Sequence, residues 1–68
     1  MLIYTVHAEE QLEIRKIEKI WVEEAVRAPD FTEREGEKYI VNKKLNGRSI
    51  KVVYVKERYI KIITVYWV

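Results

Sequence analysis

The sequence predicts an α+β domain, in which a short N-terminal strand and two helices pack on a three- to four-stranded antiparallel sheet. Residues 39–45 and 48–55 alternate Tyr, Ile and Val with Lys, Asn and Ser, as strands with one buried face do. The Asn46-Gly47 dipeptide between them is a strong signal for a two-residue hairpin turn, because it tolerates positive φ at both positions. Before residue 30, apolar side chains recur at helical spacing instead.

The size and composition exclude several classes of protein. Sixty-eight residues make a single domain, residues 1–68, whose core is marginal unless another chain adds to it. With no Cys and one His, we expect no disulfide, metal site or cofactor. No apolar run approaches the roughly 20 residues of a membrane span, and there is no signal-peptide pattern, so we expect a cytoplasmic protein with no membrane partner. Abundant Glu and Lys without Cys is typical of a thermophile.

The first elements follow from apolar spacing and end signals. Leu2 to Val6 is an apolar run long enough for one strand. Residues 7–17 switch to helical spacing, with Thr5 as the expected N-cap. Acidic residues in the first turn of this helix and basic residues in its last turn complement the helix dipole.

The remaining elements follow in order. Residues 20–28 repeat apolar side chains as a second helix does, and Pro29 ends it because proline disfavours helical geometry in the residue before it. Residues 31–37 are polar and acidic, and we expect a connector there. A second turn at Glu57-Arg58 leads into a last strand, residues 59–68.

Two-residue turns fix which residues lie opposite each other and therefore which face each side chain occupies. The expected partners are Lys44 with Ser49, Asn42 with Lys51, Ile40 with Val53, Lys51 with Thr64, and Ser49 with Tyr66. One face is mostly apolar and should pack on the helices; it holds Tyr39, Val41, Leu45, Ile50, Val52, Tyr54, Ile63, Val65 and Trp67, interrupted by Lys43, Arg48 and Lys61. A turn of three residues would flip the last strand.

The other face divides along its length. One end is apolar, and we expect it to meet a second copy or a helix of a partner protein; it comprises Ile40, Val53, Val55, Ile60 and Ile62. The other end is a polar, cationic block that suits a phosphate backbone and a stacked base; it comprises Asn42, Lys44, Ser49, Lys51, Thr64 and Tyr66. The alternative is an ordinary solvated sheet face.

The charge distribution agrees with a nucleic-acid interface on the sheet. Residues 1–37 carry five Lys or Arg against ten Asp or Glu, a net charge of −5. Residues 38–68 carry eight against one, a net charge of +7. A basic sheet beside an acidic helical half favours an anionic ligand on the sheet. The alternative is that the two halves attract each other while Lys residues protect the strand edges.

Short motifs along nearly the whole chain resemble those of the domain-of-unknown-function 4258 family. They are His7-Ala8 opening a helix, Arg15-x-Ile17 closing it, Ala28-Pro29 ending the next helix, Gly47-Arg48, Val52-Val-Tyr54 and Ile63-Thr64-x-Tyr66. Two positions depart from the family pattern. Gln11 stands where the family often has Arg, and Lys16 stands where it usually has Gly.

The resemblance places the chain near the RelE/ParE-type and BrnT-like ribonuclease toxins. It implies a RelE/ParE-like fold whose first strand lies beside the last, and a basic surface that acts on RNA, free or on the ribosome. It also implies a toxin–antitoxin pair, in which a small antitoxin would cover the apolar end of the sheet. The loss of an Arg at Gln11 puts full activity in doubt.

A metal-independent endoribonuclease of this kind activates the 2′-hydroxyl of its substrate and must neutralise the phosphate. Arg15 and Arg48 are the candidate phosphate clamps, because a guanidinium can bridge two oxygens. His7 is the candidate acid or base, and Thr64 would position the substrate. Each has a structural alternative: His7 as a capping or packing residue, Arg15 as a partner of the helix dipole, Arg48 as a residue that flanks the turn, and Thr64 as an ordinary strand residue. The Trp residues, Trp21 and Trp67, are predicted to be core.

Two functional hypotheses follow. The first is a toxin-like ribonuclease. The second is a non-catalytic domain of the same fold that binds nucleic acid or assembles with itself.

Overall fold

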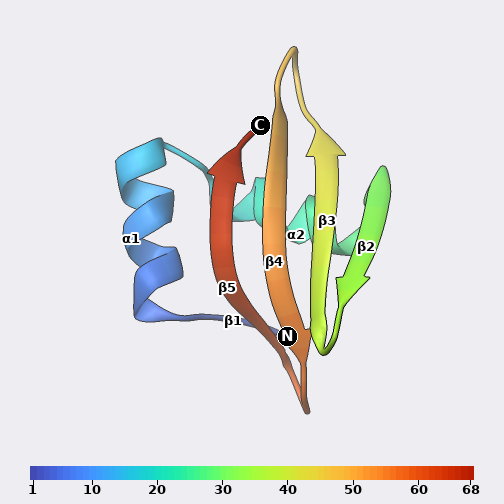
Figure 1. Ribbon diagram of the computed structural model, residues 1–68. Helices are drawn as coiled ribbons and strands as arrows, with labels where there is room; N and C mark the ends of the chain where they lie inside the picture. The colour runs from blue at the N-terminus through green and yellow to red at the C-terminus, as the bar shows by residue number, and fades with distance from the viewer.

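The computed structural model describes residues 1–68. The elements in chain order are β1 (Leu2–Tyr4), α1 (Val6–Arg15), α2 (Lys19–Arg27), β2 (Phe31–Glu35), β3 (Lys38–Lys44), β4 (Ser49–Lys56) and β5 (Ile60–Trp67). The strands form one sheet in the order β1-β5-β4-β3-β2, with α2 behind it and α1 beside β5 (Figure 1). Neither helix is long and apolar enough to cross a membrane.

The α+β class is confirmed, but the sheet differs from the expected three- to four-stranded antiparallel one. It has five strands and is mixed, because β1 runs parallel to β5 while the other pairs are antiparallel. The pairing of β1 with β5 is the arrangement that the family resemblance implied. The fifth strand is β2, which occupies the segment expected to be a connector. It pairs with β3 through a two-residue turn in which Gly36 takes φ 62°.

The helix ends follow the cap signals. The Thr5 side chain accepts a hydrogen bond from the Ala8 N–H at 3.0 Å, so the predicted N-cap of α1 is confirmed. At the other end Lys16 adopts the left-handed conformation, with φ 56° and ψ 46°. The Ile17 N–H then donates back to the Leu12 carbonyl at 2.9 Å, which closes a Schellman motif and ends α1 at Arg15.

One face of the sheet and the inner sides of both helices form the core. Its largest fully buried side chains come from α2 and from the three central strands β3, β4 and β5. The buried apolar residues are Ala8, Leu12, Ile17, Val22, Ala25, Val41, Ile50, Val52, Tyr54, Ile62 and Val65. Because both helices lie on this side or at its edge, the opposite face of the sheet is left open (Figure 1).

The β3–β4 hairpin has the predicted register, with Lys44 opposite Ser49 and Asn42 opposite Lys51. Only Gly47 of its turn takes positive φ, at 84°, whereas Asn46 does not. The prediction for the β4–β5 pair was wrong. Lys51 lies opposite Tyr66, not Thr64, and Ser49 lies beyond the last pair of that ladder.

Two irregularities cause this difference. The ladder begins at Lys56 opposite Ile60, so the turn has three residues and the first half of β5 is flipped. A bulge at Ile63 then inserts one residue, since Val53 lies opposite Thr64 but Tyr54 lies opposite Ile62. Together the two irregularities shift the register by two residues beyond the bulge, which restores the side-chain faces but not the partners. Thr64 therefore keeps its predicted face, while the faces predicted for residues 60–62 are exchanged.

Candidate nucleic-acid interface

The open face of the sheet carries one row of side chains that crosses four strands. The register places Phe31 of β2, Asn42 of β3, Lys51 of β4 and Tyr66 of β5 opposite one another. We call these four residues the central row. Phe31 is 72% exposed, and the other three side chains are half-buried. An aromatic ring therefore stands at each end of the row, with an amide and an ammonium group between them.

The predicted nucleic-acid-binding residues are gathered around this row. Lys44 and Ser49 form the neighbouring pair toward the β3–β4 turn. Thr64 lies on the other side of the row, opposite Val53. Neither Lys44 nor Lys51 has a carboxylate within ion-pair distance. Both ammonium groups are thus free to meet an anion.

A hollow of about 450 Å³ adjoins the row at the β3–β4 turn; it is lined by Asp30, Phe31, Asn42, Lys44, Leu45 and Ser49. Asp30 carries a negative charge into this hollow, where its carboxylate accepts the Lys44 backbone N–H at 2.6 Å. That charge disfavours a phosphate in the hollow itself. A phosphate is better placed at Lys51, in the middle of the row.

Sequence reasoning missed Phe31, because every residue of β2 is exposed and the strand has no apolar alternation. A local signal was present. Gly36 follows five residues without a Gly or Pro, and Gly at that position allows the tight turn into Lys38. Reading that turn would have paired Phe31 with Asn42.

The apolar end predicted for the open face is smaller than expected. Ile40, Val53 and Val55 lie there, half-buried. Ile62 is instead fully buried in the core, and Ile60 packs against the core on the helix side. The cause is the flipped first half of β5. Three half-buried side chains are a small patch for an antitoxin or a second copy.

Two side chains of α1, Gln11 and Arg15, bind the free edge of β5. β1 covers that edge only at residues 60–62, so the backbone of Val65 needs other partners. The Val65 N–H donates to Oε1 of Gln11 at 2.8 Å, and Nη1 of Arg15 donates to the Val65 carbonyl at 2.8 Å. His7, Gln11 and Arg15 follow one another at four-residue spacing, which places them in line.

His7 is held by the same arrangement. Its Nε2 lies 2.8 Å from Nε2 of Gln11, whose Oε1 is already bound to the sheet. Because an amide nitrogen only donates, the Nε2 atom of His7 accepts this bond and its ring proton is on Nδ1. The lone pair of Nε2 is therefore engaged within the protein, where His7 holds the Gln11 side chain that binds β5.

Trp67 contacts the backbone of Arg15 and the side chain of Arg48. The Trp67 indole N–H donates to the Arg15 carbonyl at 2.7 Å, and the Arg48 guanidinium lies 4.1 Å from the Trp67 ring centroid. Both arginines are exposed. Trp21 packs on Trp67 with ring centroids 5.9 Å apart, so both Trp residues are half-buried at the margin of the core.

The four catalytic candidates do not form one site. His7 and Arg15 stand about 12 Å apart along α1, at 1.5 Å per residue. Arg48 contacts Trp67 on the helix side, and Thr64 lies on the open face. The structure also brings together no group of three His, Asp or Glu side chains that could hold a metal ion. What it does assemble is the central row.

One protein-family model matches the chain. It is described as "Domain of unknown function (DUF4258)" and covers residues 4–67, from β1 through the end of β5. No curated protein and no solved structure matches the chain.

Proposed function

The chain belongs to the DUF4258 family, and we propose that it is a single-stranded RNA-binding domain that holds RNA on the open face of its sheet. The central row carries this proposal. Aromatic side chains bind single strands by stacking on bases, which are not accessible inside a duplex. The free ammonium groups of Lys51, between the rings, and of Lys44, beside the row, attract the phosphates.

The spacing of the row sets the footprint on the RNA. Phe31 and Tyr66 are three strand spacings apart, about 14 Å at 4.7–4.9 Å each. This is far more than the roughly 3.4 Å between stacked neighbouring bases. The two rings therefore take two bases separated by at least one nucleotide, whose phosphate meets Lys51. The Ser49 and Thr64 hydroxyls lie beside the row and are suited to the 2′-hydroxyl of RNA.

Kinship with the RelE/ParE-type toxins is part of the proposal. It is supported by the order of elements and by the pairing of β1 with β5. RNA cleavage is the second candidate function, and the exposed side chains of Arg15 and Arg48 favour it. Each guanidinium has five N–H donors, so donors remain for a phosphate. Binding ranks first, because the catalytic candidates lie apart.

Binding is tested by fluorescence anisotropy with a labelled eight-nucleotide single-stranded RNA and the same sequence as DNA and as duplex RNA. We expect the single-stranded RNA to bind most tightly. Phe31→Ala or Tyr66→Ala should weaken it roughly 5- to 150-fold, as the loss of one stacked base costs about 1–3 kcal/mol. Ile14→Ala, which removes another exposed apolar side chain from α1, is the matched control.

If the single strand binds no better than the duplex, or if Ile14→Ala weakens binding as much as Phe31→Ala, the RNA-binding proposal fails. Cleavage is tested separately, by gel analysis of the labelled RNA in the presence of EDTA and by growth after expression. Cleavage or growth arrest that Arg15→Ala and Arg48→Ala abolish would place the ribonuclease function first. If the RNA stays intact, growth is normal and binding is retained, the protein is a non-catalytic RNA-binding domain.

A further inference from the structure

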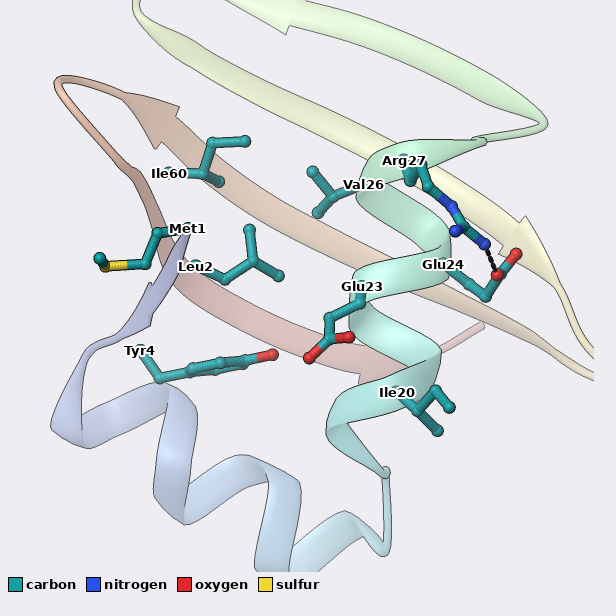
Figure 2. A pocket seen from close by; sticks show the side chains of 9 residues that line it. All are labelled: Met1, Leu2, Tyr4, Ile20, Glu23, Glu24, Val26, Arg27 and Ile60. Atoms are coloured by element: carbon teal, nitrogen blue, oxygen red, sulfur yellow. Dashed lines mark hydrogen bonds and ion pairs between the residues drawn. The ribbon is translucent and has the colours of Figure 1, made fainter.

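A groove of about 670 Å³ lies on the helix side of the sheet, between β1 and α2. Six of the nine residues that line it are apolar. Figure 2 shows Leu2 and Val26 pointing into it from opposite walls. Met1 is 92% exposed and Ile20 is 62% exposed at its margins. Ile60, which the flipped half of β5 turns away from the open face, lies here instead.

The polar groups of this groove leave one carboxylate without a partner. Glu9 pairs with Lys19 at 3.2 Å near one end, and Glu24 pairs with Arg27 on the outer side of α2. Glu23 has no cation within ion-pair distance.

The phenol of Tyr4 points across the groove toward Glu23 (Figure 2). Its hydroxyl is buried and has no hydrogen-bond partner. Burial and the charges of Glu23 and Glu9 raise the pKa of Tyr4 to about 12, so the hydroxyl stays a donor. The unpaired carboxylate of Glu23 makes this corner of the groove suited to a cation and unsuited to an anion.

We propose that this groove binds a short amphipathic helix of another protein, which presents aliphatic side chains to the apolar walls and one Lys or Arg to Glu23. Helices are recognised in this way when an apolar groove takes their apolar face. The wall provided by α2 is nine residues long, about 13 Å, which matches two to three turns of a partner helix. The single unpaired carboxylate fixes its orientation.

A second copy of the chain is a poorer occupant of the groove. In a two-fold dimer the same surface patch of both copies meets itself. Two Glu23 carboxylates would then approach each other across an apolar contact, and like charges oppose such a contact. The acidic charge of residues 1–37, −5 in total, adds to this repulsion.

The test uses synthetic 14-residue helical peptides with Leu on one face, Gln and Ala elsewhere, and one central Lys, Glu or norleucine within the Leu face. Binding to the ¹³C-methyl-labelled chain is followed by NMR. We expect the Lys peptide to shift the methyl signals of Ile20, Val26 and Ile60 and to bind about fivefold to tenfold more tightly than the norleucine peptide. The Glu peptide should bind most weakly.

Glu23→Gln should abolish the preference for Lys over norleucine, whereas Glu10→Gln, which removes the same charge from α1 outside the groove, should preserve it. Glu23 is exposed, so the variant should fold, and its methyl spectrum checks this. Shifts confined to other residues, or a Lys preference that survives Glu23→Gln, would overturn the proposal. The proposal would also be overturned if sedimentation showed a dimer and the peptides then failed to shift the methyl signals of the groove. None of these results depends on RNA binding.

Discussion

Lys16 holds a backbone conformation that is unfavourable for any residue with a Cβ. Its φ of 56° ends α1, and the left-handed region costs a non-glycine residue roughly 1–2 kcal/mol. The Gly that the family resemblance leads us to expect at this position would avoid this cost. We expect Lys16→Gly to raise the free energy of unfolding by about 1 kcal/mol, measured by urea denaturation. Lys16→Ala removes the charge but keeps the Cβ, so an equal gain with Ala would attribute the effect to charge instead.

Tyr4 is the second residue with a measurable local cost, because its buried hydroxyl has no partner. Tyr4→Phe removes that hydroxyl with little change of shape. The variant should therefore be as stable as the parent at pH 7, or more stable by up to about 1 kcal/mol. Thermal unfolding of the two proteins measures this. A variant that is clearly less stable would mean that the hydroxyl has a partner in solution.

The stability of the parent should also depend on pH through Tyr4. The unfolded chain loses the Tyr4 proton near pH 10.0, whereas the folded protein keeps it until about pH 12. In this window the unfolded state binds fewer protons, so the free energy of unfolding falls as the pH rises. Below pH 10 both states keep the Tyr4 proton, so Tyr4 causes no loss of stability with pH there. Burial and the neighbouring Tyr39 also raise the pKa of Tyr54, so Tyr4→Phe should reduce the fall without removing it.

At the scale of elements, α1 closes the edge of β5 that the short β1 leaves open. Gln11 accepts the Val65 N–H inside the contact, and only 7% of this residue is exposed. Gln11→Ala should cost about 1–3 kcal/mol, because the N–H loses its partner in a buried position. Chemical denaturation measures the cost, and amide exchange of Val65 should become faster. Glu10→Ala, on the exposed side of the same helix, should change neither quantity.

Local patterns predicted the elements that have strong end signals. Thr5, Pro29 and the Asn46-Gly47 turn set the limits of α1, α2 and the β3–β4 hairpin, as expected. Two features are not marked by apolar spacing, although the Gly36 turn is a local signal for the first of them. β2 is exposed along its whole length, so no alternation marks it. The bulge at Ile63 depends on how β5 meets both β4 and β1, which is a property of the assembled sheet.

The candidate site was predicted only in part, because some of its contacts depend on the assembled sheet. Lys51 and Thr64 share the open face as predicted, although they are not direct partners. The catalytic interpretation treated His7 and Arg15 as free side chains. The structure instead engages His7 with Gln11 and Arg15 with the Val65 carbonyl, and these roles become visible only once the free edge of β5 is known.

At the scale of the whole molecule, the two charged halves of the sequence supply the two proposed binding surfaces. The basic half supplies the cationic centre of the open face, and the acidic half supplies the carboxylate of the groove behind it. RNA on the sheet and a helix in the groove would therefore occupy opposite sides of the protein. Both could bind at once, and each can be tested without the other.

Salt dependence gives the last prediction, because it counts the phosphates that the open face neutralises. With Lys44 and Lys51 engaged, about two contacts, the slope of log K against log salt should be about −1.4, at roughly −0.7 per phosphate on single-stranded nucleic acid. Lys51→Gln should bring the slope about 0.7 closer to zero. Lys16→Gln, on the helix side, should leave it unchanged. Anisotropy titrations between about 50 and about 300 mM salt provide the slopes for the parent and both variants. Equal changes in the two variants would mean that the RNA is held by the overall charge and that the central row does not position it.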